Sequence, residues 1–131
     1  MAAVRRGVVV VAVAVLCAGC GQSVDAAAVR ESAQAFLGAV RMQDGARACE
    51  VFAQKVVDDL TAGGGTCADE LAQRSLDGDA TISAVAVWGD RAQVKTSGDT
   101  LFLARYGAAW RVTAAGCRPR AEGPYECEVE A

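Results

Sequence analysis

The chain contains no histidine, two prolines and few aromatic residues (5%) among its 131 residues. Without histidine, the chain excludes a Ser-His-Asp triad, a Cys-His nucleophile and a histidine-ligated metal centre. It also lacks an excess of basic residues, and its formal net charge of −3 argues against an electrostatic nucleic-acid interface. A hydrophobic share of 53% is too high for a disordered chain. The length and composition therefore favour a single compact domain.

No hydrophobic run is long enough to cross a bilayer. The longest one covers residues 7–19, thirteen uncharged residues between Arg6 and Cys20, whereas a membrane span needs roughly 20. A short basic start at Arg5 and Arg6, followed by this run and by small residues, is the pattern of a secretory signal peptide. We therefore expect residues 1–19 to be a signal that takes no part in the fold.

The end of the run, Ala18-Gly19-Cys20, resembles the lipobox of bacterial lipoproteins. In that family a lipid is attached to the cysteine thiol, the preceding peptide bond is cut, and the new amine is often acylated with a fatty acid such as palmitate. The position three before the cysteine is usually leucine, but here it is Cys17, and Leu16 lies one place earlier. An ordinary signal peptide cut nearby and an uncleaved anchor are the two alternatives.

The lipoprotein resemblance implies a division into a signal peptide (1–19), a tether (20–25) and a single α+β domain (26–131). The mature chain would carry eleven basic and sixteen acidic side chains, a formal charge of −5. Anionic lipid head groups repel a surface of that sign, so acyl chains rather than charge would hold the protein. We expect it at the extracytoplasmic face of the cell membrane.

Four cysteines follow the lipobox, and an even number in an exported domain predicts two disulfides. Of the three possible pairings, the local one, Cys49–Cys67 and Cys117–Cys127, is preferred. A four-thiolate zinc site is the alternative, but neither pair has the two-to-four-residue spacing of zinc knuckles. We therefore expect no metal and no cofactor.

Apolar residues recur at helical spacing in the first half of the mature chain and at a spacing of two in the second. Asp25 is a suitable N-cap for the first helix, and Thr66 with Asp69 forms a variant capping box for the third. The expected helices cover residues 25–42, 44–60 and 67–76. The expected strands cover residues 80–88, 91–97, 100–106, 109–115 and an edge strand around 125–129. Helices followed by a meander predict an α+β fold with the helices on one face of the sheet.

This order of elements is similar to that of the nuclear transport factor 2-like (cystatin-like) superfamily. The resemblance is carried by residues 35–40, by the break at Asp44-Gly45, and by Arg105-Tyr106-Gly107 leading to Trp110-Arg111-Val112. Small actinobacterial lipoproteins with two cysteine pairs look similar as well. The resemblance implies N-terminal helices packed on a curved, cone-like sheet of four to five antiparallel strands. It also implies a cavity between helix and sheet, with Arg105, Tyr106 and Trp110 as candidate lining residues.

Three functions fit this sequence. The first is a non-catalytic binding domain for an envelope protein partner or a small apolar ligand. The second is a pocket enzyme of the isomerase or hydrolase type, and the third is a structural spacer at the membrane. An empty apolar cone would favour ligand binding, and two ionisable groups converging inside it would favour the enzyme. A filled core would favour a spacer or a surface contact.

Overall fold

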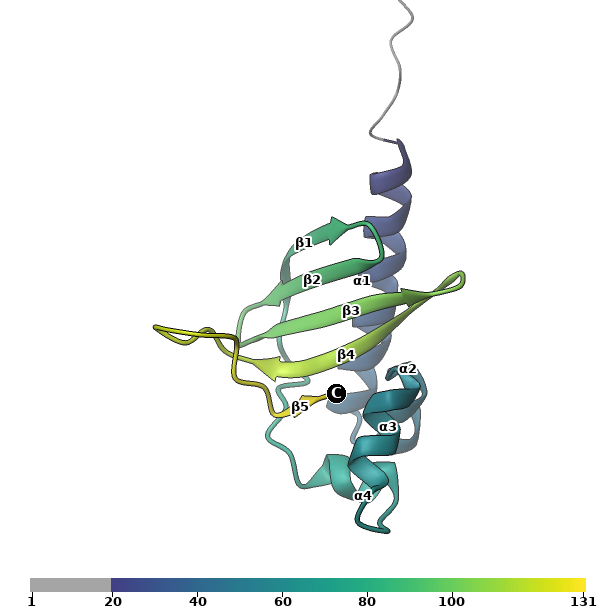
Figure 1. The fold of residues 1–131 in the computed structure, drawn as a ribbon, viewed down its shortest axis with the longest axis vertical. Helices are drawn as coiled ribbons and strands as arrows, with labels where there is room; N and C mark the ends of the chain where they lie inside the picture. The colour runs from purple at the N-terminus through teal and green to yellow at the C-terminus, as the bar shows by residue number, and fades with distance from the viewer. Residues whose placement is uncertain (1–19) are drawn as a thin grey trace, which may run out of the picture.

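A computed structural model describes residues 20–131, in which helices pack with an open antiparallel sheet (Figure 1). The expected signal peptide lies outside the described residues. Within the described part, the helices are α1 (Cys20–Arg41), α2 (Gly45–Val51), α3 (Gln54–Thr61) and α4 (Cys67–Ala72). The strands are β1 (Ile82–Trp88), β2 (Arg91–Thr96), β3 (Thr100–Tyr106), β4 (Ala109–Cys117) and β5 (Val129–Glu130). The fold is α+β, as the sequence predicts.

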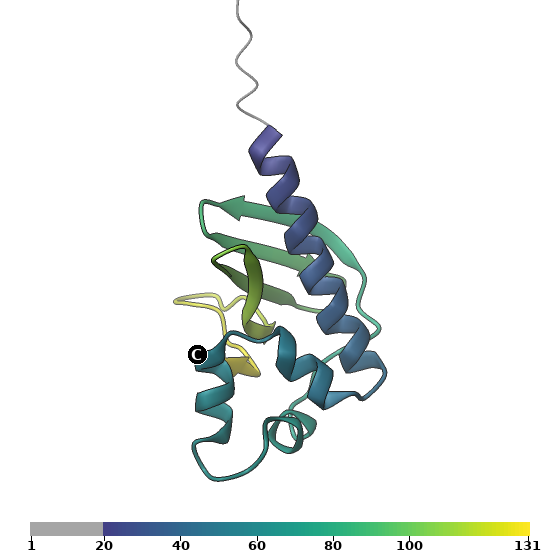
Figure 2. The same ribbon diagram turned by 90° about the vertical axis from the view of Figure 1, so that its right-hand side faces the viewer.

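The sheet follows the chain in the order β1-β2-β3-β4-β5, with every neighbouring pair antiparallel. The β1–β2 and β3–β4 turns contain Gly89 (φ 58°) and Gly107 (φ 62°), a backbone conformation that glycine adopts without steric cost. α1 crosses one face of the sheet, and the three short helices continue from its lower end (Figures 1 and 2). The predicted meander is therefore present, because its turns are encoded locally.

α1 differs from the prediction at its start. The helix begins at Cys20, so Asp25 lies inside it and is not the N-cap. Residues 20–25, expected to form a tether, are the first turns of α1. No proline interrupts this segment and Ala26, Ala27 and Ala28 follow it, so the helix extends backwards without a break.

The helix predicted over residues 44–60 is two helices, because Phe52 and Ala53 are extended. The amide of Ala53 donates a hydrogen bond to the carbonyl of Val112 (2.9 Å), and Phe52 pairs with Val112 in an isolated bridge. The Phe52 ring is 3% exposed and lies 5.0 Å from the Phe36 ring. The pairing with β4 and the burial of this ring stabilise the fold more than a continuous helix would.

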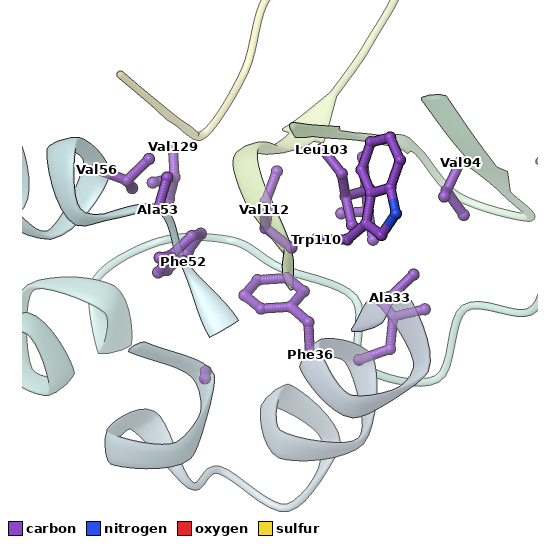
Figure 3. Packing of buried hydrophobic residues seen from close by; sticks show 14 of the residues in the cluster. Ala33, Phe36, Phe52, Ala53, Val56, Val94, Leu103, Trp110, Val112 and Val129 are labelled. Carbon is purple, nitrogen blue, oxygen red and sulfur yellow. The ribbon is translucent and has the colours of Figure 1, made fainter. Parts of the chain in front are cut away.

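The core lies between α1 and the inner face of the sheet (Figure 3). Ala33 and Phe36 approach from α1, and Val94, Leu103 and Val112 approach from the strands (Figure 3). All five side chains are at most 1% exposed. The strand residues lie on one face because cross-strand partners in an antiparallel sheet point to the same side.

Both predicted disulfides are present. Cys49–Cys67 joins α2 to α4, and Cys117–Cys127 joins the end of β4 to the segment before β5. The C-terminal strand is shorter than predicted, because the chain first leaves the sheet and returns only at β5. The predicted cap is also present: the Thr66 side chain accepts a hydrogen bond from the amide of Asp69 (3.2 Å).

Candidate functional site

The inner face of the sheet ends at a cluster of Asp25, Arg105 and Trp110. Arg105 follows Leu101 and Leu103 at alternate positions of β3, so it lies on the face that packs against α1. Its guanidinium Nη1 lies 3.5 Å from Oδ1 of Asp25, and its Cζ lies 5.8 Å from the centroid of the Trp110 ring. Both charged side chains remain partly exposed, and such pairs contribute only about 0.2–1 kcal/mol each. The cluster joins α1 to β3.

The three candidate pocket residues do not line one cavity. Trp110 is 4% exposed and packs into the core, with Arg105 across its ring. Tyr106 comes one residue after Arg105 and faces the outer side of the sheet, where it is 52% exposed. The structure therefore brings Arg105 and Trp110 together and places Tyr106 on the opposite face.

Side chains fill the space between α1 and the sheet. Phe36, Phe52 and Trp110 are the largest side chains of this packing, and none of them is more than 4% exposed (Figure 3). A small apolar ligand in this position would have to displace core side chains, which costs several kcal/mol per large residue. The interior is therefore a packed core where the family resemblance leads us to expect an empty cone.

A groove of about 580 Å³ lies at the other end of α1, between α1, α2 and α4. Ala39, Ala48 and Leu71, none more than 6% exposed, are among its lining residues. The Asp44, Asp69 and Arg74 side chains add charge to the lining. The result is a groove with a mixed polar and apolar lining that carries one net negative charge.

Two features of the sequence hold the groove in shape. The Cys49–Cys67 bridge fixes α4 to α2. Gly45 lets α2 approach α4 closely, because a Cβ at this position would lie 3.0 Å from Cβ of Ala68. No sequence motif predicts this groove. The predicted bridge was its only signal, since the bridge requires the second and third helices to be neighbours.

The described residues offer little acid–base or metal chemistry. No group of three histidine, cysteine or carboxylate side chains within residues 20–131 is placed to hold a metal ion. Burial raises the pKa of the Asp99 carboxyl above its ordinary 3.8; a hydrogen bond from Thr96 opposes this shift, and the nearby Asp77 carboxylate adds to it. Asp99 sits in the β2–β3 turn, where its backbone carbonyl also accepts a bond from the Thr96 hydroxyl (2.9 Å). Its role there is to shape the turn.

The acidic pairs of the sequence have structural partners. Asp59 pairs with Lys55 at 3.0 Å, and Asp58 accepts a hydrogen bond from Gln54 at 2.9 Å. Asp77 accepts a bond from the amide of Asp79 at 3.0 Å, which closes a tight turn. These carboxylates stabilise helices and turns.

Comparison of the chain with protein families, with curated proteins and with solved structures found no match. Among residues 20–131, no helix has the length and hydropathy that a membrane span requires. The groove, the filled core and the position of Cys20 are therefore the features that bear on function.

Proposed function

We propose that the chain is a lipoprotein, anchored through Cys20 at the extracytoplasmic face of the cell membrane, with a non-catalytic domain that binds an envelope protein. The two disulfides support this location, because such bridges persist in oxidising compartments and are rare in the cytosol. Lipid at Cys20 would be attached at the first residue of α1. The anchor and the folded domain would then form one continuous unit.

The groove between α1, α2 and α4 is the observation that carries the binding proposal. It is held open by a covalent bridge, and a preformed site loses less entropy on binding than a flexible one. Its mixed lining and net negative charge suit a partner segment that places a basic residue beside small side chains. The filled core argues against a small apolar ligand between α1 and the sheet.

The distance between the two ends of α1 also supports a protein partner. A helix of 22 residues is about 33 Å long, and the groove lies at the end opposite Cys20. α3 and α4 lie with this end, far from the start of α1 (Figure 1). If α1 stands upright on the membrane, the groove lies about this far from it and is accessible to another envelope protein.

The anchor is tested by mass spectrometry of the native protein with and without reductant. We expect loss of residues 1–19, a mass increase from lipid and acyl groups, and two bridges that appear as four missing hydrogens. The Cys20→Ser variant should lose the lipid and leave the membrane fraction. Retention of this variant, unlipidated, in the membrane would refute the anchor.

The binding role is tested by placing a photo-crosslinking amino acid at Ala72, on the groove wall, or at the exposed Ala121 as a matched control. We expect one protein to be cross-linked in cells from Ala72 and none from Ala121. The same protein, purified, should bind the mature chain, and the Ala72→Arg change should weaken binding about tenfold, equivalent to ~1.4 kcal/mol. Equal labelling at both positions, or no labelling, would favour the alternative of a structural spacer, which the filled core also permits.

A further inference from the structure

The outer face of the sheet, opposite α1, is not covered by any helix within residues 20–131. Figure 1 shows this face toward the viewer, with α1 behind the strands and the three short helices below the sheet. Two of the large hydrophobic side chains that are most exposed in the described chain, Trp88 (60%) and Tyr106 (52%), lie on this face. The face therefore presents aromatic rings to the solvent.

The strand register places Arg91 between these two rings. Arg91 is directly opposite Trp88 on β1 and Ala104 on β3, and directly opposite residues of an antiparallel sheet point to the same side. This is the outer side, because the next residue, Ala92, is buried in the core. Tyr106 follows Ala104 by two residues, so it lies diagonally from Arg91, at about 7–8 Å, within reach of a long side chain.

The charges of the chain are distributed unevenly. Of the eleven basic and sixteen acidic side chains in residues 20–131, strands β1–β4 carry four basic ones and no acidic one. Arg105 pairs with Asp25, and Arg111 donates a hydrogen bond to a backbone carbonyl of α2. Arg91 and Lys95 both point outward from β2, and no carboxylate of the described residues lies within 4.0 Å of either cation. The outer face is therefore basic on a chain that is acidic elsewhere.

The chain covers one part of this face itself. Tyr125, from the segment between β4 and β5, lies with its ring 5.1 Å from the Phe102 ring, and Gln93 donates a hydrogen bond to the Tyr125 hydroxyl (3.1 Å). Phe102 and Gln93 are partly buried as a result, whereas Trp88 and Tyr106 are mostly exposed. We call the part that stays exposed the open sheet face; its residues are Trp88, Arg91, Lys95 and Tyr106.

We propose that the open sheet face is a second docking surface, which binds an acidic segment of a protein partner. Tryptophan, tyrosine and arginine are the residues that carry most of the binding energy at protein interfaces. Cations without carboxylate partners select an acidic partner and accelerate its association. This surface differs from the groove between α1, α2 and α4, which carries a net negative charge, and the inference does not depend on the lipid anchor.

The charge of the rest of the chain favours a protein segment over an extended anionic surface. Outside β1–β4, residues 20–131 carry all sixteen acidic side chains and the other seven basic ones. A bilayer rich in anionic lipid, or a nucleic acid, would bring many negative charges close to these carboxylates and be repelled. A short acidic segment can contact Arg91 and Lys95, whose Cα atoms are about 13 Å apart along β2, without meeting the acidic helices.

The test titrates the mature protein, in a neutral detergent, with a glutamate–tyrosine copolymer that presents carboxylates beside apolar rings. We expect the emission of Trp88 to change on binding, and the Trp88→Phe variant to lose this change, because Trp110 is buried in the core. A lysine–tyrosine copolymer should cause no change. The double variant Arg91→Gln with Lys95→Gln should bind the acidic copolymer about tenfold more weakly, and added salt should weaken binding by the wild type.

The matched control removes the same charge from the helices. Arg30 and Arg47 are exposed, so Arg30→Gln with Arg47→Gln should bind the acidic copolymer as the wild type does. Equal weakening in the two double variants, or no binding by the wild type, would overturn the proposal. Preferential binding to phosphatidylglycerol vesicles would overturn it in favour of a membrane contact. Self-association at low salt that is lost with Arg91→Gln and Lys95→Gln would overturn it in favour of a second copy of this chain.

Discussion

Removing the Cys49–Cys67 bridge tests how the groove is built. The bridge closes a chain segment with a sequence separation of 18, and loop-closure entropy assigns such a bridge about 3 kcal/mol at 25 °C. The double variant Cys49→Ala with Cys67→Ala should therefore lower the free energy of unfolding by about 3 kcal/mol. Urea denaturation, followed by the fluorescence of the buried Trp110, measures this change.

The structure also predicts that loss of this bridge destabilises α4 in particular. Leu71 is the buried residue of the six-residue helix α4 and supplies about 1.5–3 kcal/mol of apolar burial. Helices this short are marginal in water, so α4 depends on its bridge to α2. Without the bridge we expect the amides of α4 to exchange rapidly with solvent, while those of the central strands β2 and β3 stay protected. The groove would lose one wall.

The Cys117–Cys127 bridge is the matched control. Its separation of 10 gives a similar loop-closure effect, about 2.7 kcal/mol, but it lies at the β4–β5 end of the fold. Removing it should lower the global stability by nearly as much and leave α4 protected. The reasoning is refuted if α4 stays protected without Cys49–Cys67, or if both variants expose it equally in hydrogen-exchange mass spectrometry.

Three further experiments test other parts of the structure. A double-mutant cycle of Asp25→Asn and Arg105→Ala should give a coupling of about 0.2–1 kcal/mol that falls with added salt, measured by denaturation; a coupling insensitive to salt would contradict the exposed ion pair. Burial raises the pKa of Asp99 in the folded state, so the stability it contributes is fully present below pH 3.8 and is lost as the pH rises through the folded pKa. The stability of the wild type relative to Asp99→Asn should fall over that range, and a rise would show that the sign is wrong. Gly78→Ala places a Cβ 2.4 Å from the backbone of a neighbouring helix and should cost about 1–3 kcal/mol, whereas Gly63→Ala meets nothing within 4 Å and should change the melting temperature little.

The sheet could be predicted from the sequence because its signals are local. The turns at Gly89 and Gly107 separate runs of alternating residues, and β3 matches its predicted bounds of 100–106. The disulfide pairing was equally accessible, because bridges between near neighbours such as Cys117 and Cys127 need little knowledge of the fold. Each of these features depends on residues close together in the chain.

The features that sequence reasoning missed depend on distant contacts. The break after α2 exists because Phe52 and Ala53 meet Val112, some sixty residues later. Helical spacing in the sequence carries no sign of this pairing. Asp25 is a second case. Its residue type and position suit an N-cap, but its side chain pairs with Arg105, a residue far away in the sequence. The groove is a third case, since its walls come from three helices.

The start of α1 has the widest consequence for function. Gly21, Gln22 and Ser23 suggest a flexible exit from a membrane, yet the helix runs through them to Cys20. A lipid on a coil fixes only the distance of a domain from the bilayer, whereas a lipid on the first turn of a helix also limits its tilt. The same helix that anchors the core would then set the groove about 33 Å away from the lipid.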